Sequence, residues 1–451
     1  MLQAERKEVL KSVQKGEPFA TGYQLLYRGV LKPFKVWEIP MEALIYNQYN
    51  GRIGSVVKSY EKQSHTLNPE LDSDITLIET FLWESKKEAN KNTLDSLRKT
   101  GQIKFGIVSS DGVIIDGNRR ASLMNKILKD PHSIQEEKDR CKFFKAVILP
   151  ESATKKDILQ LETSFQMGED EKVDYNPIEK YLKCKDLEDA GFTRDEIASF
   201  MGINKKEVDQ NIEILELMDM YLGFYEYDGI YTMAEGHEDS FQKLNIALKQ
   251  YKSGVANMWN YTDEDINNML GVAFDYIRLN LPQNDIRDIF RKPTQNSSSI
   301  FGSKERWNRF FENHQEIVSS YIEKPIEDYV KNASGIDITP CLQARDADWR
   351  KKLTPVMTAT FKKAQDEIDS QLNSNAPIIL INKANSALDS IDSSSNGFKN
   401  NADSISKGLD DLIKKAKSLT YIIHSGFISG YQNRYGDNLK PPTNVYHRMT
   451  A

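Results

Sequence analysis

The pattern of hydrophobic and polar positions divides the chain into a first part with short strands and a longer part that is almost entirely helical. Residues 36–40 alternate between apolar and polar side chains, as a half-buried strand does. Short apolar runs that fit buried strands follow at residues 105–108, 113–115 and 143–149. The dipeptide Asp111-Gly112, which joins two of them, is typical of hairpin turns. Strands that alternate with helices over residues 36–150 predict a compact α/β domain.

The segments around these strands give weaker signals. Residues 1–35 predict a polar helix followed by an irregular arm that ends near Pro33. Residues 60–93 have the apolar spacing of helices, and a further short helix is expected to begin at residues 94–97. Gly101 is expected to end that helix, because glycine is common just after the last helical residue.

Residues that typically cap helices recur along the chain from residue 151 to about residue 225. A helix is expected over residues 156–166, and Asn176 with Pro177 marks the start of another. Thr193 and Glu196 form a capping box, Gly202 ends the short helix that follows, and Asn204 caps a longer one. A helix, a glycine-containing turn and a second helix predict a helix-turn-helix.

The C-terminal half predicts helices without recognisable chemistry. Pro340 and Pro355 are expected to interrupt residues 333–357, and long helical stretches are expected at 356–392 and 402–424, before a flexible tail. Both stretches contain apolar stripes that are not clean heptads, so a simple long coiled coil is not expected. The stripes predict either self-association or an intramolecular bundle with residues 238–330.

Composition excludes several classes of protein. The 451 residues are 39% hydrophobic and 28% charged, which favours folded domains over disorder. The net charge of −6 gives no global attraction to nucleic acid. Three scattered cysteines and six histidines form no metal-binding or disulfide motif. No segment is typical of a signal peptide or a membrane span, so a cytoplasmic protein without membrane contact is expected.

The most specific stretch is the turn before residue 118. A short strand ends at Asp116-Gly117, and Asn118, Arg119 and Arg120 open a helix. Glycine allows close approach of the backbone to a ligand, and a helix N-terminus attracts anions. The turn therefore predicts a phosphate site that includes two arginines. The alternative is a pair of solvent-facing arginines bound to carboxylates.

Three segments in order resemble the ParB family of chromosome and plasmid partition proteins. Residues 36–53 resemble the first box of the ParB/sulfiredoxin-like domain, with Asn50 and Arg52 in its Asn-x-Arg position. Gly117-Asn118-Arg119-Arg120 stands where the family has Gly-Glu-Arg-Arg. Residues 161–179, from Leu161-Glu162-Thr163 to Asn176-Pro177-Ile178-Glu179, resemble the third box, and a helix-turn-helix follows as in the family. The resemblance covers roughly residues 36–220.

The resemblance implies a nucleoside triphosphate, CTP, bound with Mg²⁺. Gly117, Arg119 and Arg120 would hold the phosphates together with Arg52 and Asn118, and Glu162 would lie near the metal. Asn118 replaces a glutamate that the family associates with hydrolysis, and asparagine cannot act as a general base. The resemblance therefore implies binding without implying turnover. Thr163 replaces the family's asparagine, and residues 167–173 are an insertion.

The helix-turn-helix offers a possible DNA contact on its second helix. Base edges are normally read by basic and amide side chains, here Lys205, Lys206, Gln210 and Asn211. The same helix also contains acidic residues that would repel phosphates, namely Glu207, Asp209, Glu213 and Glu216. The alternative is a purely structural pair of helices.

We therefore expect an α+β multidomain protein with a ParB/sulfiredoxin-like α/β domain, a helix-turn-helix domain and a mostly α-helical C-terminal region. The expected segments are an arm (1–35), the nucleotide-binding domain (36–150), the helix-turn-helix domain (151–225), a helical middle (226–333), a C-terminal helical region (334–429) and a tail (430–451). The favoured function is a nucleotide-regulated DNA-binding homodimer. The alternatives are an enzyme on the same fold, either a nuclease or a phosphotransferase in defence against foreign DNA, and an interaction protein without nucleotide turnover.

Overall fold

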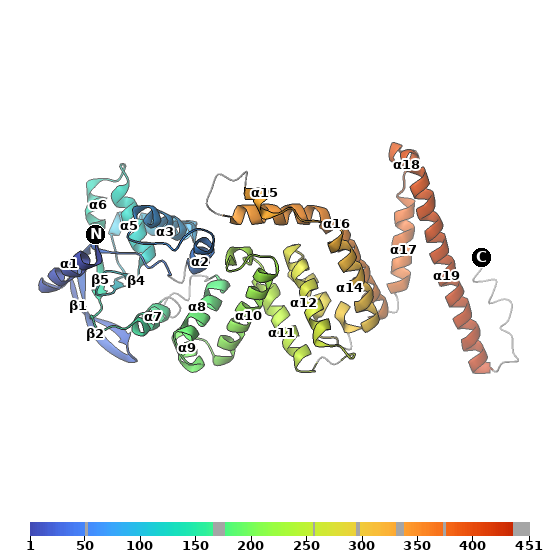
Figure 1. Ribbon diagram of the computed structural model, residues 1–451, viewed down its shortest axis with the longest axis horizontal. Coiled ribbons are helices and arrows are strands. Elements are labelled where there is room, and N and C mark those ends of the chain that lie inside the picture. The colour runs from blue at the N-terminus through green and yellow to red at the C-terminus, as the bar shows by residue number, and fades with distance from the viewer. Residues whose placement is uncertain are drawn as a thin grey trace. The chain divides into compact units, whose positions relative to one another are not determined.

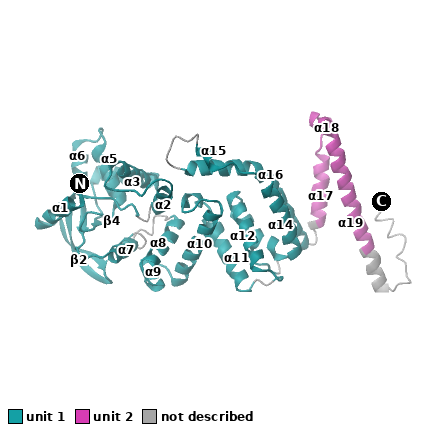
Figure 2. Cartoon of the chain, viewed as in Figure 1, with its two compact units in different colours: residues 1–372 teal, residues 373–451 magenta. Residues whose placement is uncertain are grey.

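The computed structural model describes residues 1–49, 53–165, 176–255, 258–294, 298–330, 338–372 and 376–435. The chain divides into two compact units, residues 1–372 and residues 373–451 (Figure 1, Figure 2). The fold is α+β and mostly helical, as the sequence predicted, with one five-stranded mixed sheet in the first unit.

The sheet has the strand order β1-β2-β5-β3-β4. Its strands are β1 (Ala20–Tyr27), β2 (Val30–Pro40), β3 (Gly106–Val108), β4 (Ile114–Asp116) and β5 (Phe143–Ile148). β3 and β5 pair in parallel, and the other neighbouring strands pair antiparallel. The hairpin predicted at Asp111-Gly112 joins β3 to β4, and Gly112 has a φ of 88°.

The polar helix expected at the N-terminus is confirmed, but the irregular arm expected after it is wrong, because a β-hairpin stands there. α1 (Gln3–Lys15) precedes β1, and β1 pairs with β2 across a turn at Arg28-Gly29. Both turn residues have positive φ, 54° and 73°, as tight hairpin turns require. β1 is an edge strand with only two buried side chains, so it lacks the clean alternation that would have revealed it.

The two faces of the sheet pack against different hydrophobic cores, because successive strand residues point to opposite faces. Val108, Ile114 and Ala146 face a core covered by helices that precede or follow the central strands, whereas their neighbours Ile107 and Val147 belong to a second core with Leu161. The helices of the larger core are α1, α2 (Gly54–Gln63), α3 (Asp72–Glu84), α4 (Lys87–Thr100) and α5 (Asn118–Lys129), with α6 (Gln135–Cys141) beside them. α7 (Lys155–Thr163) covers the smaller core.

The remainder of the first unit is helical. Its helices are α8 (Pro177–Asp189), α9 (Arg194–Met201), α10 (Lys205–Phe224), α11 (Glu238–Lys252), α12 (Asp263–Arg278), α13 (Gln283–Phe290), α14 (Lys304–Ser319), α15 (Ile326–Val330) and α16 (Thr339–Leu372). One core joins most of them, with Phe241, Tyr276 and Trp307 fully buried in it. The break expected at Pro355 is absent, because Pro355 lies inside α16, which packs against α14.

The second unit is a set of helices with little core. It contains α17 (Ala376–Asp389), α18 (Asn396–Asn400) and α19 (Ala402–Tyr435). The flexible tail was predicted from residue 430, but α19 continues to Tyr435, and residues 436–451 lie outside the described residues. Between residues 377 and 425 the described side chains include none that is buried.

Candidate functional site

The arginine turn has the conformation that its sequence predicts. β4 ends at Asp116, Gly117 has a φ of 107°, and α5 begins at Asn118. A Cβ on residue 117 would lie 2.6 Å from Cζ of Phe144 and 3.2 Å from a guanidinium nitrogen of Arg120. Glycine is therefore required here for both its left-handed backbone and its lack of a side chain.

The N-terminus of α5 has the properties of an anion-binding helix end. Its N-cap is Gly117, which has no side chain to accept a hydrogen bond from the first turn. The first N–H groups of a helix have no intrahelical acceptor, and the helix dipole places partial positive charge there. No acidic residue lies in the first turn. An anion at this end of α5 would meet backbone N–H donors and a favourable potential.

The two arginines differ in their surroundings. Arg120 forms an ion pair with Asp116 at 2.8 Å and donates to the carbonyl of Phe105 at 3.2 Å. Its Nε is buried without a hydrogen-bond partner among the described residues. Arg119 is half-buried at the second position of α5. Asp116 fixes the Arg120 side chain and neutralises part of its charge, while Nε keeps a donor available.

Asn118 connects α5 to the segment after β2. It is 2% exposed, its amide nitrogen donates to the carbonyl of Ile114 at 3.2 Å, and its Oδ1 accepts the backbone N–H of Asn47 at 3.0 Å. A glutamate could accept the second bond but could not make the first when ionised. Asparagine at this position therefore satisfies two backbone groups.

Glu162 is joined to the same segment but is already paired with a cation. It accepts from Nδ2 of Asn47 at 3.3 Å and from Nζ of Lys183 at 3.0 Å. Both charged side chains are at most 5% exposed. The part of the chain that the structure describes contains no group of three or more His, Cys, Asp and Glu side chains that could hold a metal ion. Glu162 as it stands does not fit a Mg²⁺ ligand.

The Asn-Pro-x-Glu segment holds two helices together. Oδ1 of Asn176 accepts the N–H of Ile178 at 3.0 Å, and Pro177 is the first residue of α8. Glu179 is 4% exposed and accepts the N–H of Ser55 at 2.8 Å in the first turn of α2. Burial raises the pKa of Glu179, while the bonds from Ser55 oppose that rise. α8 thereby supplies the cap of α2 from a distant part of the chain.

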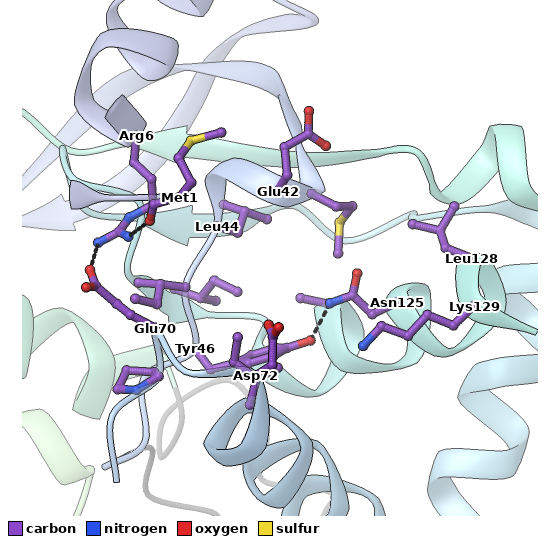
Figure 3. Close-up of a pocket in the computed structure, with 16 residues that line it drawn as sticks. Met1, Arg6, Glu42, Leu44, Tyr46, Glu70, Asp72, Asn125, Leu128 and Lys129 are labelled. Carbon is purple, nitrogen blue, oxygen red and sulfur yellow. Dashed lines mark hydrogen bonds and ion pairs between the residues drawn. The ribbon is translucent and has the colours of Figure 1, made fainter. Parts of the chain in front are cut away.

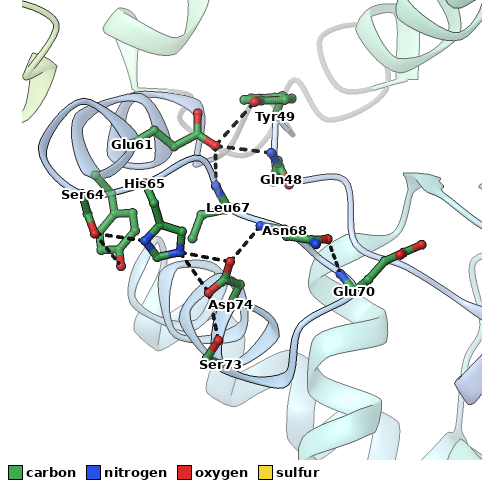
Figure 4. Close-up of polar contacts among 11 residues, drawn as sticks. Gln48, Tyr49, Glu61, Ser64, His65, Leu67, Asn68, Glu70, Ser73 and Asp74 are labelled. Carbon is green, nitrogen blue, oxygen red and sulfur yellow. Dashed lines mark hydrogen bonds and ion pairs between the residues drawn. The ribbon is translucent and has the colours of Figure 1, made fainter. Parts of the chain in front are cut away.

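A second polar network holds the residues that precede this cap. Glu61 accepts from Gln48 at 3.3 Å, from the hydroxyl of Tyr49 at 3.4 Å and from the N–H of Leu67 at 2.9 Å (Figure 4). Residues 47–49 are therefore fixed by contacts on both sides. Arg52 and Asn50, predicted from the first box, lie outside the described residues, as do Gln166 and the insertion at 167–173.

The nearby cavity is distinct from the arginine turn. It has a volume of about 460 Å³ and lies beside the later turns of α5 (Figure 3). Asn125 donates to the hydroxyl of Tyr46 at 2.7 Å within it, and Arg6 pairs with Glu70 at 2.9 Å. Among the described residues, Gly117, Asn118, Arg119 and Arg120 do not line this cavity.

The predicted helix-turn-helix has the expected caps. Thr193 caps α9, Gly202 follows α9 with a φ of 67°, and Asn204 caps α10. Lys206 is exposed, and Lys205 is exposed but paired with Asp195 at 3.1 Å.

The amide side chains of Gln210 and Asn211, which were expected to contact DNA bases, are less accessible than the two lysines. Gln210 is half-buried. Nδ2 of Asn211 contacts Sγ of Cys184 on α8 at 3.5 Å, which turns this amide toward the neighbouring helix. Arg194 is neutralised by Glu188 and Asp209. The surface of this element therefore offers mainly the two lysines to an anionic partner.

Sequence reasoning missed Asn47 and Lys183, although these residues connect the predicted positions. Asn47 lies in an ordinary polar segment, and only its contacts with Asn118 and Glu162 distinguish it. Lys183 lies between the buried Leu182 and Cys184 of α8, and a lysine among such neighbours was an available signal.

Comparison with protein-family models and with curated proteins gave no match. The described helices include none that is long and apolar enough to cross a membrane.

Proposed function

We propose that this chain is a ParB-like nucleotide-binding protein whose arginine turn holds the phosphates of a nucleoside triphosphate, CTP. The observation that carries the proposal is the geometry at Gly117. A left-handed glycine opens α5 without a side-chain cap, and Arg119 and Arg120 follow on its first turn. The first N–H groups of α5 and the two guanidinium groups provide the donors that phosphate oxygens need.

The neighbouring contacts support a preformed site. Asn118, Asn47 and Glu162 form a continuous chain of hydrogen bonds beside the turn. Preformed donors cost less entropy when a ligand binds than donors that must be ordered. The turn would hold phosphate, and the segment that contains Asn47 would lie next to it.

The test is calorimetric titration of the full chain with CTP, ATP, GTP and UTP. Arg119→Ala should weaken binding by about 1–3 kcal/mol, the usual contribution of a hydrogen bond to a charged group. Arg309→Ala is the matched control, because Arg309 is an exposed arginine paired with Glu367 on distant helices. Equal nucleotide affinity in the wild type and Arg119→Ala would reject the arginine turn as the phosphate site.

We propose DNA as the partner of the helix-turn-helix, through Lys205 and Lys206. Because acidic residues surround these lysines, binding should be modest and should weaken steeply with salt. The double variant Lys205→Ala/Lys206→Ala should lower both the affinity for duplex DNA and the slope of affinity against salt concentration. Lys243→Ala/Lys252→Ala on α11 is the control, and equal losses in both pairs would exclude specific contact by α10.

We propose that α19 pairs with α19 of a second copy. Eleven large hydrophobic side chains of the second unit are at least 37% exposed. Such an apolar surface normally marks an interaction site. Six apolar residues of α19 are separated alternately by four and three positions, contrary to the expectation that the stripe is not a clean heptad. They are Ile405, Leu409, Leu412, Ala416, Leu419 and Ile423. This spacing is that of a coiled-coil seam.

Charge favours an antiparallel arrangement of the two copies. Asp410 and Asp411 precede the middle of the seam, and Lys414, Lys415 and Lys417 follow it. Parallel helices would bring like charges to the same level, whereas antiparallel helices place the acidic half of one copy against the basic half of the other. The alignment that sets Leu412 opposite Ala416 also sets Leu409 opposite Leu419, and it brings Asp411 of one copy to the level of Lys417 of the other.

Light scattering on the full chain tests the pairing. Leu412→Lys places a charge in the seam and should convert the dimer to a monomer. Tyr421→Lys changes a side chain that is 73% exposed and lies outside the seam, so the dimer should persist. A monomeric wild type at micromolar concentration, or a dimer that survives Leu412→Lys, would refute this interface.

A further inference from the structure

Glu162 and Lys183 form a buried ion pair, which bears on whether Glu162 can bind a metal ion. Glu162 lies on α7 and Lys183 on α8, and they are 3% exposed each. One oxygen of Glu162 binds Lys183 at 3.0 Å, and the other accepts from Asn47 at 3.3 Å. The backbone N–H of Asn47 in turn donates to Oδ1 of Asn118 at the start of α5 at 3.0 Å. The ammonium group is therefore linked to Asn118 through Glu162 and Asn47.

A divalent ion could take this carboxylate only by displacing Lys183. The neighbours of Lys183 on α8 are apolar and buried, among them Leu182, Cys184 and Leu187. Breaking a buried ion pair and leaving one charge without its partner costs about 3–5 kcal/mol. Mg²⁺ also retains much of its hydration and usually binds with one or two carboxylates. The arrangement favours the lysine over the metal.

The ammonium group of Lys183 can neutralise negative charge on a phosphate, which is a role that Mg²⁺ would otherwise have. It has three N–H donors, and the structure assigns one of them to Glu162. Donors in a buried position require an acceptor, either water or a ligand oxygen. A lysine next to a phosphate site contributes a positive charge without recruiting a metal.

We propose that Lys183 replaces the divalent cation at this site, so that the nucleoside triphosphate binds without Mg²⁺. The inference rests on the proposed function, since it concerns the same ligand. Glu162 then holds Lys183 in place and is not a metal ligand. This reverses the metal role that the family resemblance implied for Glu162.

The experiment is calorimetric titration of the full chain with CTP, first in millimolar Mg²⁺ and then in EDTA. Wild-type affinity should agree within about twofold between the two buffers, well below the tenfold change that corresponds to about 1.4 kcal/mol. Lys183→Met keeps the length of the side chain and should weaken binding at least tenfold in EDTA. Lys185→Met is the matched control, because Lys185 is on the same helix and is 41% exposed.

The outcomes separate this inference from the proposed function. Binding in Mg²⁺ that disappears in EDTA would overturn the role of Lys183 and leave the nucleotide site standing. Equal affinity of Lys183→Met and the wild type in EDTA would overturn it as well. Absence of binding to every triphosphate in both buffers would overturn the proposed function, and the inference with it. Because Lys183→Met leaves Glu162 buried without its partner, the double variant Glu162→Gln/Lys183→Met, which removes both charges, should show the same loss of affinity in EDTA, and wild-type affinity in the double variant would overturn the inference.

Discussion

Replacing Glu179 should loosen α2, because Glu179 caps the first turn of that helix. The Glu179 carboxylate accepts the N–H of Ser55, and that N–H belongs to a residue only 1% exposed. Glu179→Ala would leave this donor buried without an acceptor, which costs about 1–3 kcal/mol.

Hydrogen exchange followed by mass spectrometry measures this loss locally. A loss of about 1–3 kcal/mol should speed exchange in residues 54–63 by about 5- to 140-fold, since each 1.4 kcal/mol is tenfold. Glu179→Gln keeps an oxygen that can accept from Ser55, so exchange should change far less. Glu84→Ala is the control, because Glu84 is exposed and forms a surface pair with Lys87. Exchange in α2 that is unaffected by Glu179→Ala would refute the capping role.

The shifted pKa of Glu179 also predicts how the stability of Glu179→Gln, relative to the wild type, changes with pH. Because burial raises the pKa of Glu179, the folded state favours the protonated form more than the unfolded state does. Its contribution to stability is therefore present at low pH and declines as pH rises through the folded pKa. Glu179→Gln cannot ionise, so its stability relative to the wild type should increase from acidic to neutral pH.

Two further predictions concern the same fold. Gly117→Ala should lower the melting temperature and nucleotide affinity more than Gly191→Ala, because both glycines have positive φ but only the first would also collide with Phe144; equal melting shifts in the two variants would contradict the steric argument. The ion pair with Arg28 lowers the pKa of Asp157 to about 2, so this group's contribution to stability is present above pH 4 and is lost as pH falls toward about 2. In Asp157→Asn the melting temperature should therefore fall less between pH 4 and pH 2 than in the wild type. An equal fall in the variant and the wild type would show that other groups control acid stability.

The sequence by itself determined the elements whose causes are local. Asn176, Thr193 and Asn204 accept hydrogen bonds from N–H groups two or three residues later, so each cap could be identified from neighbouring residues. The same holds for Gly117 and for the hairpin at residues 111–112, where the required backbone angles restrict the residue type. The α+β class followed from these elements and from the spacing of apolar residues.

Only the tertiary structure decided which distant residues meet. β1 became a strand because β2 supplies its hydrogen bonds, although few of its own side chains are buried. Pro355 remained inside α16 because burial of Leu353 and Met357 compensates the missing N–H bond. The pairing of Glu162 with Lys183 joins residues 21 positions apart in sequence on two helices. No local pattern encodes such a contact, since its energy depends on packing that the whole chain must complete.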